Sequence, residues 1–354
     1  RDRFTYDLPS FPDERGVFAE VLKTRDSGQF SFFTTLPGIT RGQHYHQSKS
    51  EKFIIINEKT EFNELINSLE RDTIINDILS FSVLSKIMEY QENIKEGAYK
   101  VKTNMSNYDM ITMLRSGNQT PINITFSYAR KIDDLAEKIT KKLKMSDDDL
   151  MSYLYDNIED YNDFNKLDII SIFLPDTYEV YWNISPNKLT EKMYSEYKKF
   201  WNKERLEKLD KINLEQKEVI VLASIVASES RMLDEADRIA GVYMNRLNSN
   251  MRLQADPTLV FAANDYTIRR VLNKHKKIKS PYNTYIHKGL PPGPIRLASK
   301  DYIDAVLNYE KHDYIFMCAK EDFSGYHAFA TNLTDHNRNA KKFQKALNLR
   351  KIYR

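Results

Sequence analysis

The sequence predicts an α+β protein, and three observations along its 354 residues support that prediction. Residues 1–53 are rich in alternating and aromatic runs that are typical of strands. Residues 54–164 alternate short strands with short amphipathic helices, and residues 165–354 combine longer helices with proline-containing connections. We therefore expect a short β-rich segment, then one or more small α+β modules, and finally a mixed α/β domain.

The composition limits the class of protein and its partners. Hydrophobic residues make up 41% and charged residues 29% of the chain, which is ordinary for a globular protein with length for two or three cores. The net charge is +3, from 53 basic and 50 acidic side chains. This near balance produces no electrostatic field strong enough to attract nucleic acid. The single cysteine, Cys318, excludes an internal disulfide.

No signal peptide or membrane anchor is visible in this chain. The longest apolar run, 219–227, is far shorter than the ~20 residues of a membrane span and predicts a buried helix. Because the first residue is Arg1 and not Met, the sequence leaves open what precedes it.

The first 53 residues predict β structure. The runs 18–22 and 30–33 alternate or are aromatic, and turn residues lie at 26–28 and 37–38. The character of the sequence changes after Phe53.

Residues 54–120 predict two helices, a strand at 97–101 and a third helix. Thr60 is expected to cap the first helix and Ser80 to begin the second. A capping box that opens at Ser106 should start the third helix, and Gly117 should end it. The apolar residues with helical spacing are Phe62, Leu65, Ile66 and Leu69, then Phe81, Leu84 and Met88, then Met110, Ile111 and Leu114.

A comparable unit follows, with a strand at 122–126 and two helices. The first of these helices carries Ile132, Ile139 and Leu143 on one face, and Ser146 should cap the second. Strand, helix, helix is the pattern of a LysM-like carbohydrate-binding fold, although the spacing is generic. We therefore expect residues 54–164 to include a LysM-like module.

The third region contains a helix that ends in a carboxylate. After a charged amphipathic helix at 188–209, Asn213 and Gln216 can form a capping box that opens a helix running to Glu229. Leu222, Val226 and Glu229 share one face of this helix, so the carboxyl group ends an apolar stripe. Desolvation there would raise its pKa, as a proton donor near neutral pH requires. The alternative is that Glu229 turns into water or pairs with Arg231 or Arg238.

Several segments in a fixed order resemble the endolytic murein transglycosylases, the YceG-like or MltG family. Each segment alone is a weak signal, and their order and spacing make the resemblance specific over about residues 53–354. One departure is visible: many members have Glu two positions before the catalytic one, where this chain has Ala227. The matching segments are 174–178 (LPDTY), 222–229 (LASIVASE), 239–247 (IAGVYMNRL), 253–258 (LQADPT), 280–285 (SPYNTY), 289–295 (GLPPGPI), 327–329 (HAF) and 336–337 (HN).

The resemblance implies a catalytic domain at 165–354 with Glu229 as acid and base. Such an enzyme cleaves the β-1,4 bond between MurNAc and GlcNAc without water and leaves a 1,6-anhydroMurNAc end, so that one carboxyl group serves both steps and no cofactor is needed. Ordinary glycosidases use two carboxylates, and a lone acid among amides favours the intramolecular route. The candidate substrate-binding residues are Asn245, Gln254, Asp256, Asn283, Tyr285 and His327, each of which could instead be a structural turn, cap or packing residue.

The N-terminal segment contains a possible metal motif. His44 and His46 are two positions apart, so on a strand they share a face, and Glu51 follows five positions later. This fits the first metal motif of a cupin, and the three residues are weak candidates for ligands.

The same segment, with 13–22 and 37–42, resembles the C-terminal cupin domain of CapF-like capsular polysaccharide enzymes. The resemblance ends at about Phe53, and the next histidine is His275. A barrel needs more strands than this. We therefore expect residues 1–53 to be an incomplete cupin-like segment that binds no metal.

The leading hypothesis is an enzyme that cuts within nascent glycan strands and ends their polymerisation. The resemblance implies peptidoglycan as substrate, peptidoglycan synthases as partners, and a place in the cell envelope at the periplasmic face of the inner membrane. It also implies a membrane anchor, which is normal for the family and absent from this chain. The alternatives are a non-catalytic peptidoglycan-binding protein and a metal-dependent cupin enzyme of capsule-sugar biosynthesis.

Overall fold

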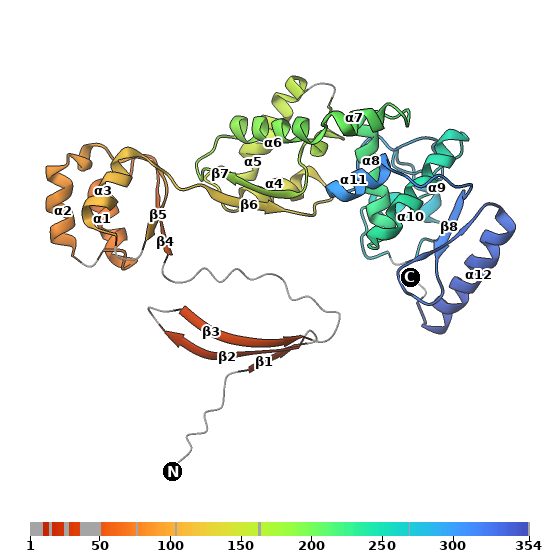
Figure 1. The fold of residues 1–354 in the computed structure, drawn as a ribbon, viewed down its shortest axis with the longest axis horizontal. Helices are drawn as coiled ribbons and strands as arrows, with labels where there is room; N and C mark the ends of the chain where they lie inside the picture. Colours follow the sequence, from red (N-terminus) through yellow and green to blue (C-terminus); the bar gives the residue numbers. More distant parts are fainter. Residues whose placement is uncertain are drawn as a thin grey trace, which may run out of the picture. The chain divides into compact units, whose positions relative to one another are not determined.

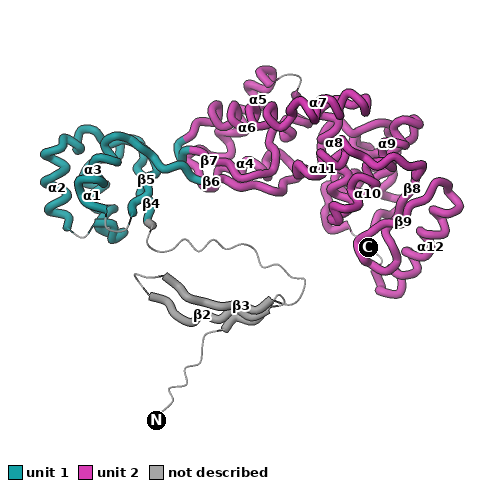
Figure 2. The backbone as a smooth tube through the Cα atoms, viewed as in Figure 1, with its two compact units in different colours: residues 1–122, 181–183 teal, residues 123–180, 184–354 magenta. Residues whose placement is uncertain are grey.

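The computed structural model describes residues 51–75, 77–102, 105–161, 164–268 and 270–352, together with the strand backbone of 10–13, 16–24 and 28–35. The chain divides into two compact units, 1–122 with 181–183 and 123–180 with 184–354 (Figure 2). The described residues mix helices with small sheets, so the predicted α+β class is confirmed.

The N-terminal strands form a three-stranded antiparallel sheet in the order β1-β2-β3. They are β1 (Ser10–Asp13), β2 (Gly16–Thr24) and β3 (Gly28–Thr35). His44, His46 and the side chain of Glu51 lie outside the described residues. The cupin-like identity of this segment and the expectation that it binds no metal therefore stay predictions.

The rest of the first unit is a two-stranded antiparallel sheet with three helices. The strands are β4 (Glu51–Ile56) and β5 (Gly97–Lys102), with Ile54 opposite Tyr99. The helices are α1 (Phe62–Arg71), α2 (Ile78–Ile87) and α3 (Asn107–Ser116), with a short 3₁₀ helix, η1 (Tyr90–Glu92). Their inward faces form one core that includes Ile56, Leu69, Phe81, Tyr99, Ile111 and Leu114.

The helix ends in this unit show which capping residues could be predicted from the sequence and which could not. The Ser106 hydroxyl accepts a hydrogen bond from the Asp109 N–H at 3.1 Å, and Gly117 ends α3 with φ 73°, as predicted. The predicted roles of Thr60 and Ser80 are wrong. The Thr60 hydroxyl donates to the Asn57 carbonyl at 2.9 Å in the preceding turn, and the N-cap of α2 is Asp77, whose carboxylate accepts from the Ser80 N–H at 3.0 Å.

The second unit begins with β6 (Ile122–Phe126), which pairs with β7 (Asp176–Val180). Between these strands lie α4 (Ile132–Thr140) and α5 (Asp147–Asp156), and Ser146 caps α5 in a capping box as predicted. Two 3₁₀ helices follow, η2 (Ile158–Tyr161) and η3 (Ile169–Ile172). The strand-helix-helix order is confirmed, and the LysM-like identity stays a prediction.

The single helix predicted at 188–209 is two helices, α6 (Pro186–Phe200) and α7 (Lys203–Leu209). The chain leaves the helical conformation at Trp201, whose ψ is 62° and whose side chain is only 4% exposed. Asn202 then caps the new helix by accepting from the Arg205 N–H at 3.0 Å. The helical periodicity of the sequence does not reveal this break, which lies at a buried indole.

Three of the remaining helices pack around α8 (Gln216–Glu229). It contacts α9 (Ala236–Asn248), α10 (Asp256–Ala263) and α11 (Lys300–Leu307) (Figure 1). The antiparallel strands β8 (Phe316–Ala319) and β9 (His327–Ala330) are covered by α12 (Leu333–Leu349), and η4 (Leu233–Glu235) and η5 (His275–Lys277) lie in connections. Within the described ranges, no helix has the length and apolar character needed to cross a bilayer.

Candidate functional site

The helix α8 is buried on every side for most of its length. Every residue from Val219 to Ala227 is buried. The predicted apolar stripe is therefore too narrow a description, because α8 is the centre of the domain and not a surface helix with one inward face. Its C-terminal end is the part that opens to a cavity, and Glu229 is its last residue.

The start of α8 differs from the prediction. Its capping box joins Glu215 and Glu218, whose carboxylate accepts from the Glu215 N–H at 2.8 Å. The predicted box of Asn213 and Gln216 is wrong: Asn213 has a left-handed backbone with φ 51°, and the Gln216 side chain accepts from the Tyr197 hydroxyl at 3.1 Å.

Glu229 is half-buried at the wall of the cavity. Its carboxyl group accepts a hydrogen bond from the hydroxyl of Tyr243, which is on α9. Burial raises the pKa of Glu229 to about 7, the hydrogen bond from Tyr243 works against this rise, and the negative charge of Asp256 adds to it. A carboxyl group in this state can hold a proton near neutral pH and release it to a bound molecule.

The alternative ion pairs of Glu229 are not formed. The Arg238 Nε atom lies 2.8 Å from the Glu310 carboxylate, and Arg231 has no carboxylate partner among the described residues. The carboxyl group of Glu229 is therefore available to the cavity.

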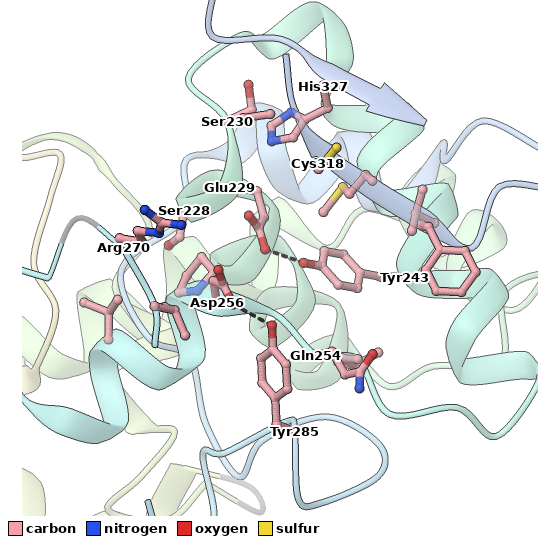
Figure 3. Close-up of a pocket in the computed structure, with 18 of the residues that line it drawn as sticks. Ser228, Glu229, Ser230, Tyr243, Gln254, Asp256, Arg270, Tyr285, Cys318 and His327 are labelled. Carbon is pink, nitrogen blue, oxygen red and sulfur yellow. Dashed lines mark hydrogen bonds between the residues drawn. The ribbon is translucent and has the colours of Figure 1, made fainter. Parts of the chain in front are cut away.

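The cavity has a volume of about 1130 Å³ and lies entirely in the second unit. In the close-up, Glu229 lies between Tyr243 and Asp256, with His327 and Cys318 above it and Tyr285 and Gln254 below (Figure 3). Of the predicted site residues, those that line the cavity are Glu229, Gln254, Asp256, Tyr285 and His327.

Asp256 brings a second carboxyl group into the cavity. It is the first residue of α10, and its Oδ1 atom accepts from the Tyr285 hydroxyl at 2.6 Å. Burial raises the pKa of Asp256, while the hydrogen bond from Tyr285 and the charge of Lys276 oppose the rise. The prediction of a lone acid is corrected here, because Glu229 and Asp256 are close enough for their charges to interact.

The loop before α10 is held by Arg246, a residue that was not among the predicted site residues. Its guanidinium is buried and donates to the Ile315 carbonyl at 2.6 Å and to the Arg252 and Leu253 carbonyls at 3.0 Å. It also donates to the side-chain oxygen of Gln254 at 3.2 Å, where the backbone has φ 52°. Arg246 lies one helical turn after Tyr243 on α9, so the two side chains share one face of this helix. That spacing within the 239–247 segment could have predicted both as site residues.

His327 is fixed by a buried carboxylate. Its Nδ1 atom lies 2.8 Å from Glu235 Oε2, and its backbone N–H donates to Oε1 of the same residue at 3.0 Å. Both side chains are almost fully buried, 8% and 5% exposed. His327 is thus a rigid part of the cavity wall.

Asn245 and Asn283 do not line the cavity. The amide NH₂ of Asn245 donates to the His312 and Tyr314 carbonyls at 2.7 and 2.9 Å. Asn283 is fully buried, and its amide binds the Lys276 and Ile278 carbonyls at 3.1 and 2.8 Å and the Tyr285 N–H at 2.9 Å. Both residues hold loops in place, so the predicted contact with sugar has no support from the structure at these two positions.

The proline-containing segment 289–295 packs against α8. The Ile295 N–H donates to the buried hydroxyl of Ser224 at 3.1 Å, and a Cβ atom at Gly293 would lie 2.1 Å from the Leu167 carbonyl oxygen. Ile295 and Arg296 reach the cavity wall. The loop therefore connects the core helix to the border of the site.

The model of the YceG-like family matches residues 54–342. The chain belongs to the YceG-like family. A crystal structure of a YceG-like protein from Listeria monocytogenes is similar with a TM-score of 0.54 and 25% identity, over 82% of this chain and 99% of that one.

Two similar proteins carry the name endolytic murein transglycosylase. One, from Bacillus subtilis, is 38% identical over 125 residues, which are 35% of this chain and 34% of the relative. The other, from Streptococcus pneumoniae, is 25% identical over 325 residues, 82% of this chain and 58% of the relative. The chain thus spans about a third to somewhat over half of the length of these relatives.

A further relative has a different name. A UDP-2-acetamido-2,6-beta-L-arabino-hexul-4-ose reductase from Pseudomonas aeruginosa is 41% identical over 113 residues, 32% of this chain and 28% of that protein. The family match begins only at residue 54.

Proposed function

We propose that this protein is an endolytic lytic transglycosylase that cleaves the β-1,4 bond between MurNAc and GlcNAc within nascent peptidoglycan strands. The observation that carries the proposal is the position of Glu229, a carboxyl group with a pKa of about 7 at the open end of a buried helix. The names of the Bacillus and Streptococcus relatives support the same class of substrate.

In the proposed reaction, Glu229 acts first as an acid and then as a base. Its proton goes to the leaving O4 of GlcNAc as the bond from C1 of MurNAc to that oxygen breaks. The resulting carboxylate accepts the proton of the C6 hydroxyl, and O6 bonds to C1, which gives the 1,6-anhydroMurNAc end. Because the nucleophile belongs to the substrate, the reaction consumes no water and needs no cofactor.

The neighbours of Glu229 fit these two steps. The Tyr243 hydroxyl stabilises the carboxylate that exists between them. Asp256 carries negative charge beside the bond that breaks, where the sugar becomes positively charged. Gln254, Tyr285 and His327 are proposed to contact the sugar hydroxyl and acetamido groups, because they line the cavity.

Asp256 also favours one rival reaction. Glycosidases that use water need two carboxyl groups across the scissile bond, and Asp256 could serve as the second one. The product would then be a reducing end that has gained water. The substrate and the bond would be the same in both reactions.

Digestion of purified peptidoglycan, followed by mass spectrometry of the products, tests the proposal. We expect anhydro ends from the wild type and a loss of at least about a thousandfold in rate for Glu229→Gln, which keeps the shape and loses the acid. Glu137→Gln, at an exposed position on α4, is the matched control and should cleave like the wild type. Hydrated ends would show hydrolysis, and binding to peptidoglycan without any cleavage by the wild type would show a binding protein.

The proposed place of action is the cell envelope, at the periplasmic face of the inner membrane and next to a peptidoglycan synthase. There the enzyme would end the polymerisation of each strand. Chromatography of glycan strands from cells with and without the Glu229→Gln substitution checks this, with longer strands expected for the variant and equal lengths contradicting the terminase role.

A further inference from the structure

The cavity wall is strongly basic, although the whole chain is nearly balanced in charge. Two carboxyl groups line the cavity, Glu229 and Asp256, against six cationic side chains. Arg246 donates to backbone carbonyls, Arg270 donates to the Asn348 side chain at 3.1 Å, and Lys276 lies over the Tyr285 ring at 4.9 Å. The other three are Arg130, Arg231 and Arg296.

These three residues, called here the arginine cluster, lie beside Glu229. Arg296 donates to the Ala227 carbonyl at 3.1 Å, two residues before Glu229, and Arg231 follows Glu229 by two residues. The guanidinium groups of Arg296 and Arg130 both lie over the ring of Tyr128, at 4.5 and 5.0 Å from its centre. Two of the three arginines therefore share the Tyr128 ring, and Arg130 also lies over the Tyr266 ring, 3.9 Å from its centre.

The positive charges of the arginine cluster are not neutralised by the protein. Burial lowers the pKa of Arg296, and the charges of Arg130 and Arg231 act in the same direction, so both groups lie within electrostatic reach of Arg296. In the part of the chain that the structure describes, none of the three pairs with a carboxylate. Like charges held together without a counterion are unfavourable, and an anionic ligand would relieve the repulsion.

The chemistry of the anion follows from the place of the cluster. Guanidinium groups match carboxylates in a two-pronged geometry. A glycan backbone of amide-substituted sugars offers no such anion, but the muramyl sugar at the proposed scissile bond carries a peptide on its lactyl group, and that peptide has free carboxylates. A diphosphate-linked strand end is also anionic, but an endolytic enzyme cuts at a distance from it.

We propose that the arginine cluster is a subsite for the carboxylates of the stem peptide on the muramyl residue next to the cleaved bond. This inference rests on the proposed function and adds a selection rule to it. The enzyme prefers strands that still carry peptides, as newly made strands do, over strands from which the peptides have been removed.

The test compares two substrates of equal strand length, one with stem peptides and one stripped of them by an amidase. The wild type should have a kcat/KM at least about tenfold higher on the peptide-bearing strands, since one charge-assisted hydrogen bond has that effect. In Arg130→Gln/Arg231→Gln this ratio should fall close to one. Arg296 is left unchanged because it binds the Ala227 carbonyl.

The matched control is Arg252→Gln/Arg338→Gln, which removes the same charge from two exposed residues that do not line the cavity. It should keep the wild-type ratio. Equal rates of the wild type on both substrates, or an unchanged ratio in Arg130→Gln/Arg231→Gln, would overturn the inference, as would an equal loss on both substrates. Cleavage of neither substrate by the wild type would instead overturn the proposed function.

Calorimetric titration with the free stem peptide tests the subsite without cleavage. We expect binding to the wild type that weakens at least about tenfold in Arg130→Gln/Arg231→Gln and becomes weaker with added salt. No difference between the two proteins would contradict the subsite. Tighter binding of inorganic diphosphate than of the peptide would also contradict it and would point to the lipid-linked strand end.

Discussion

The buried carboxyl group of Glu229 should make the fold less stable above neutral pH, and Glu229→Gln should remove that cost. The pKa of Glu229 rises from its ordinary value of 4.5 to about 7 in the folded protein. The folded state therefore holds the proton more tightly than the unfolded state, and stability falls as the pH rises from 4.5 to about 7. Glutamine does not titrate, so the variant keeps its stability through this interval.

The expected size follows from the two pKa values. At roughly 1.4 kcal/mol for each pH unit, the difference corresponds to about 3 kcal/mol above pH 7, and contact of the half-buried side chain with cavity water reduces the expectation to about 2 kcal/mol. For a domain of this size, about 2 kcal/mol raises Tm by roughly 4–8 °C. Below pH 4.5 the two proteins should melt alike.

Thermal unfolding of the two proteins between pH 4 and pH 9 measures the effect without any substrate. Glu137→Gln, which changes an exposed glutamate on α4 in the same way, should follow the wild type at every pH. A gap between wild type and Glu229→Gln that is equal at pH 5 and pH 8, or absent at both, would refute the reasoning. It would mean that Glu229 is solvated and has no raised pKa.

Two further substitutions probe α9, which carries both Tyr243 and Gly241. Tyr243→Phe removes the hydrogen bond that favours the carboxylate, so the pKa of Glu229 should rise further. The alkaline limb of the pH profile of kcat/KM should therefore move to higher pH by about half to one unit. A move to lower pH would contradict the assigned contact. Gly241→Ala places a Cβ atom 2.3 Å from the Glu310 carbonyl oxygen, so chemical denaturation should show a loss of about 1–3 kcal/mol, and unchanged stability would mean that α9 does not pack this closely.

The sequence was a good guide where structure is decided by neighbours in the chain. Ser106, Gly117 and Ser146 act at helix ends as their residue types and spacing predict. Thr60 and Asn213 are residue types equally suited to cap a helix. The Thr60 hydroxyl instead bonds to the Asn57 carbonyl in the preceding turn, and the left-handed backbone of Asn213 prevents it from acting as an N-cap. Several nearby backbone groups compete for the hydrogen bond of a potential capping side chain, and a single sequence does not show which of them it binds.

The site was predictable only in part for a similar reason. The resemblance supplied Glu229 together with Gln254, Asp256, Tyr285 and His327, and the place of Glu229 at the end of an apolar run gave its assignment a physical reason. Asn245 and Asn283 have the same amide chemistry as a sugar-binding residue, yet backbone carbonyls occupy their NH₂ groups. Arg130 joins the site from 99 positions before Glu229, a distance at which no local pattern gives a signal.

Because α8 is buried on all sides, the position of Glu229 is more strongly constrained than that of the other residues that line the cavity. Rotation of this helix by one residue would turn Glu229 toward a different neighbour and force several core side chains to repack, so the acid is tied to the whole interior. The residues that face it across the cavity come from separate segments outside α8, among them 253–256, 295–296 and β8. Descendants of such a protein can therefore acquire new preferences for the strand they hold while the position of their acid stays the same.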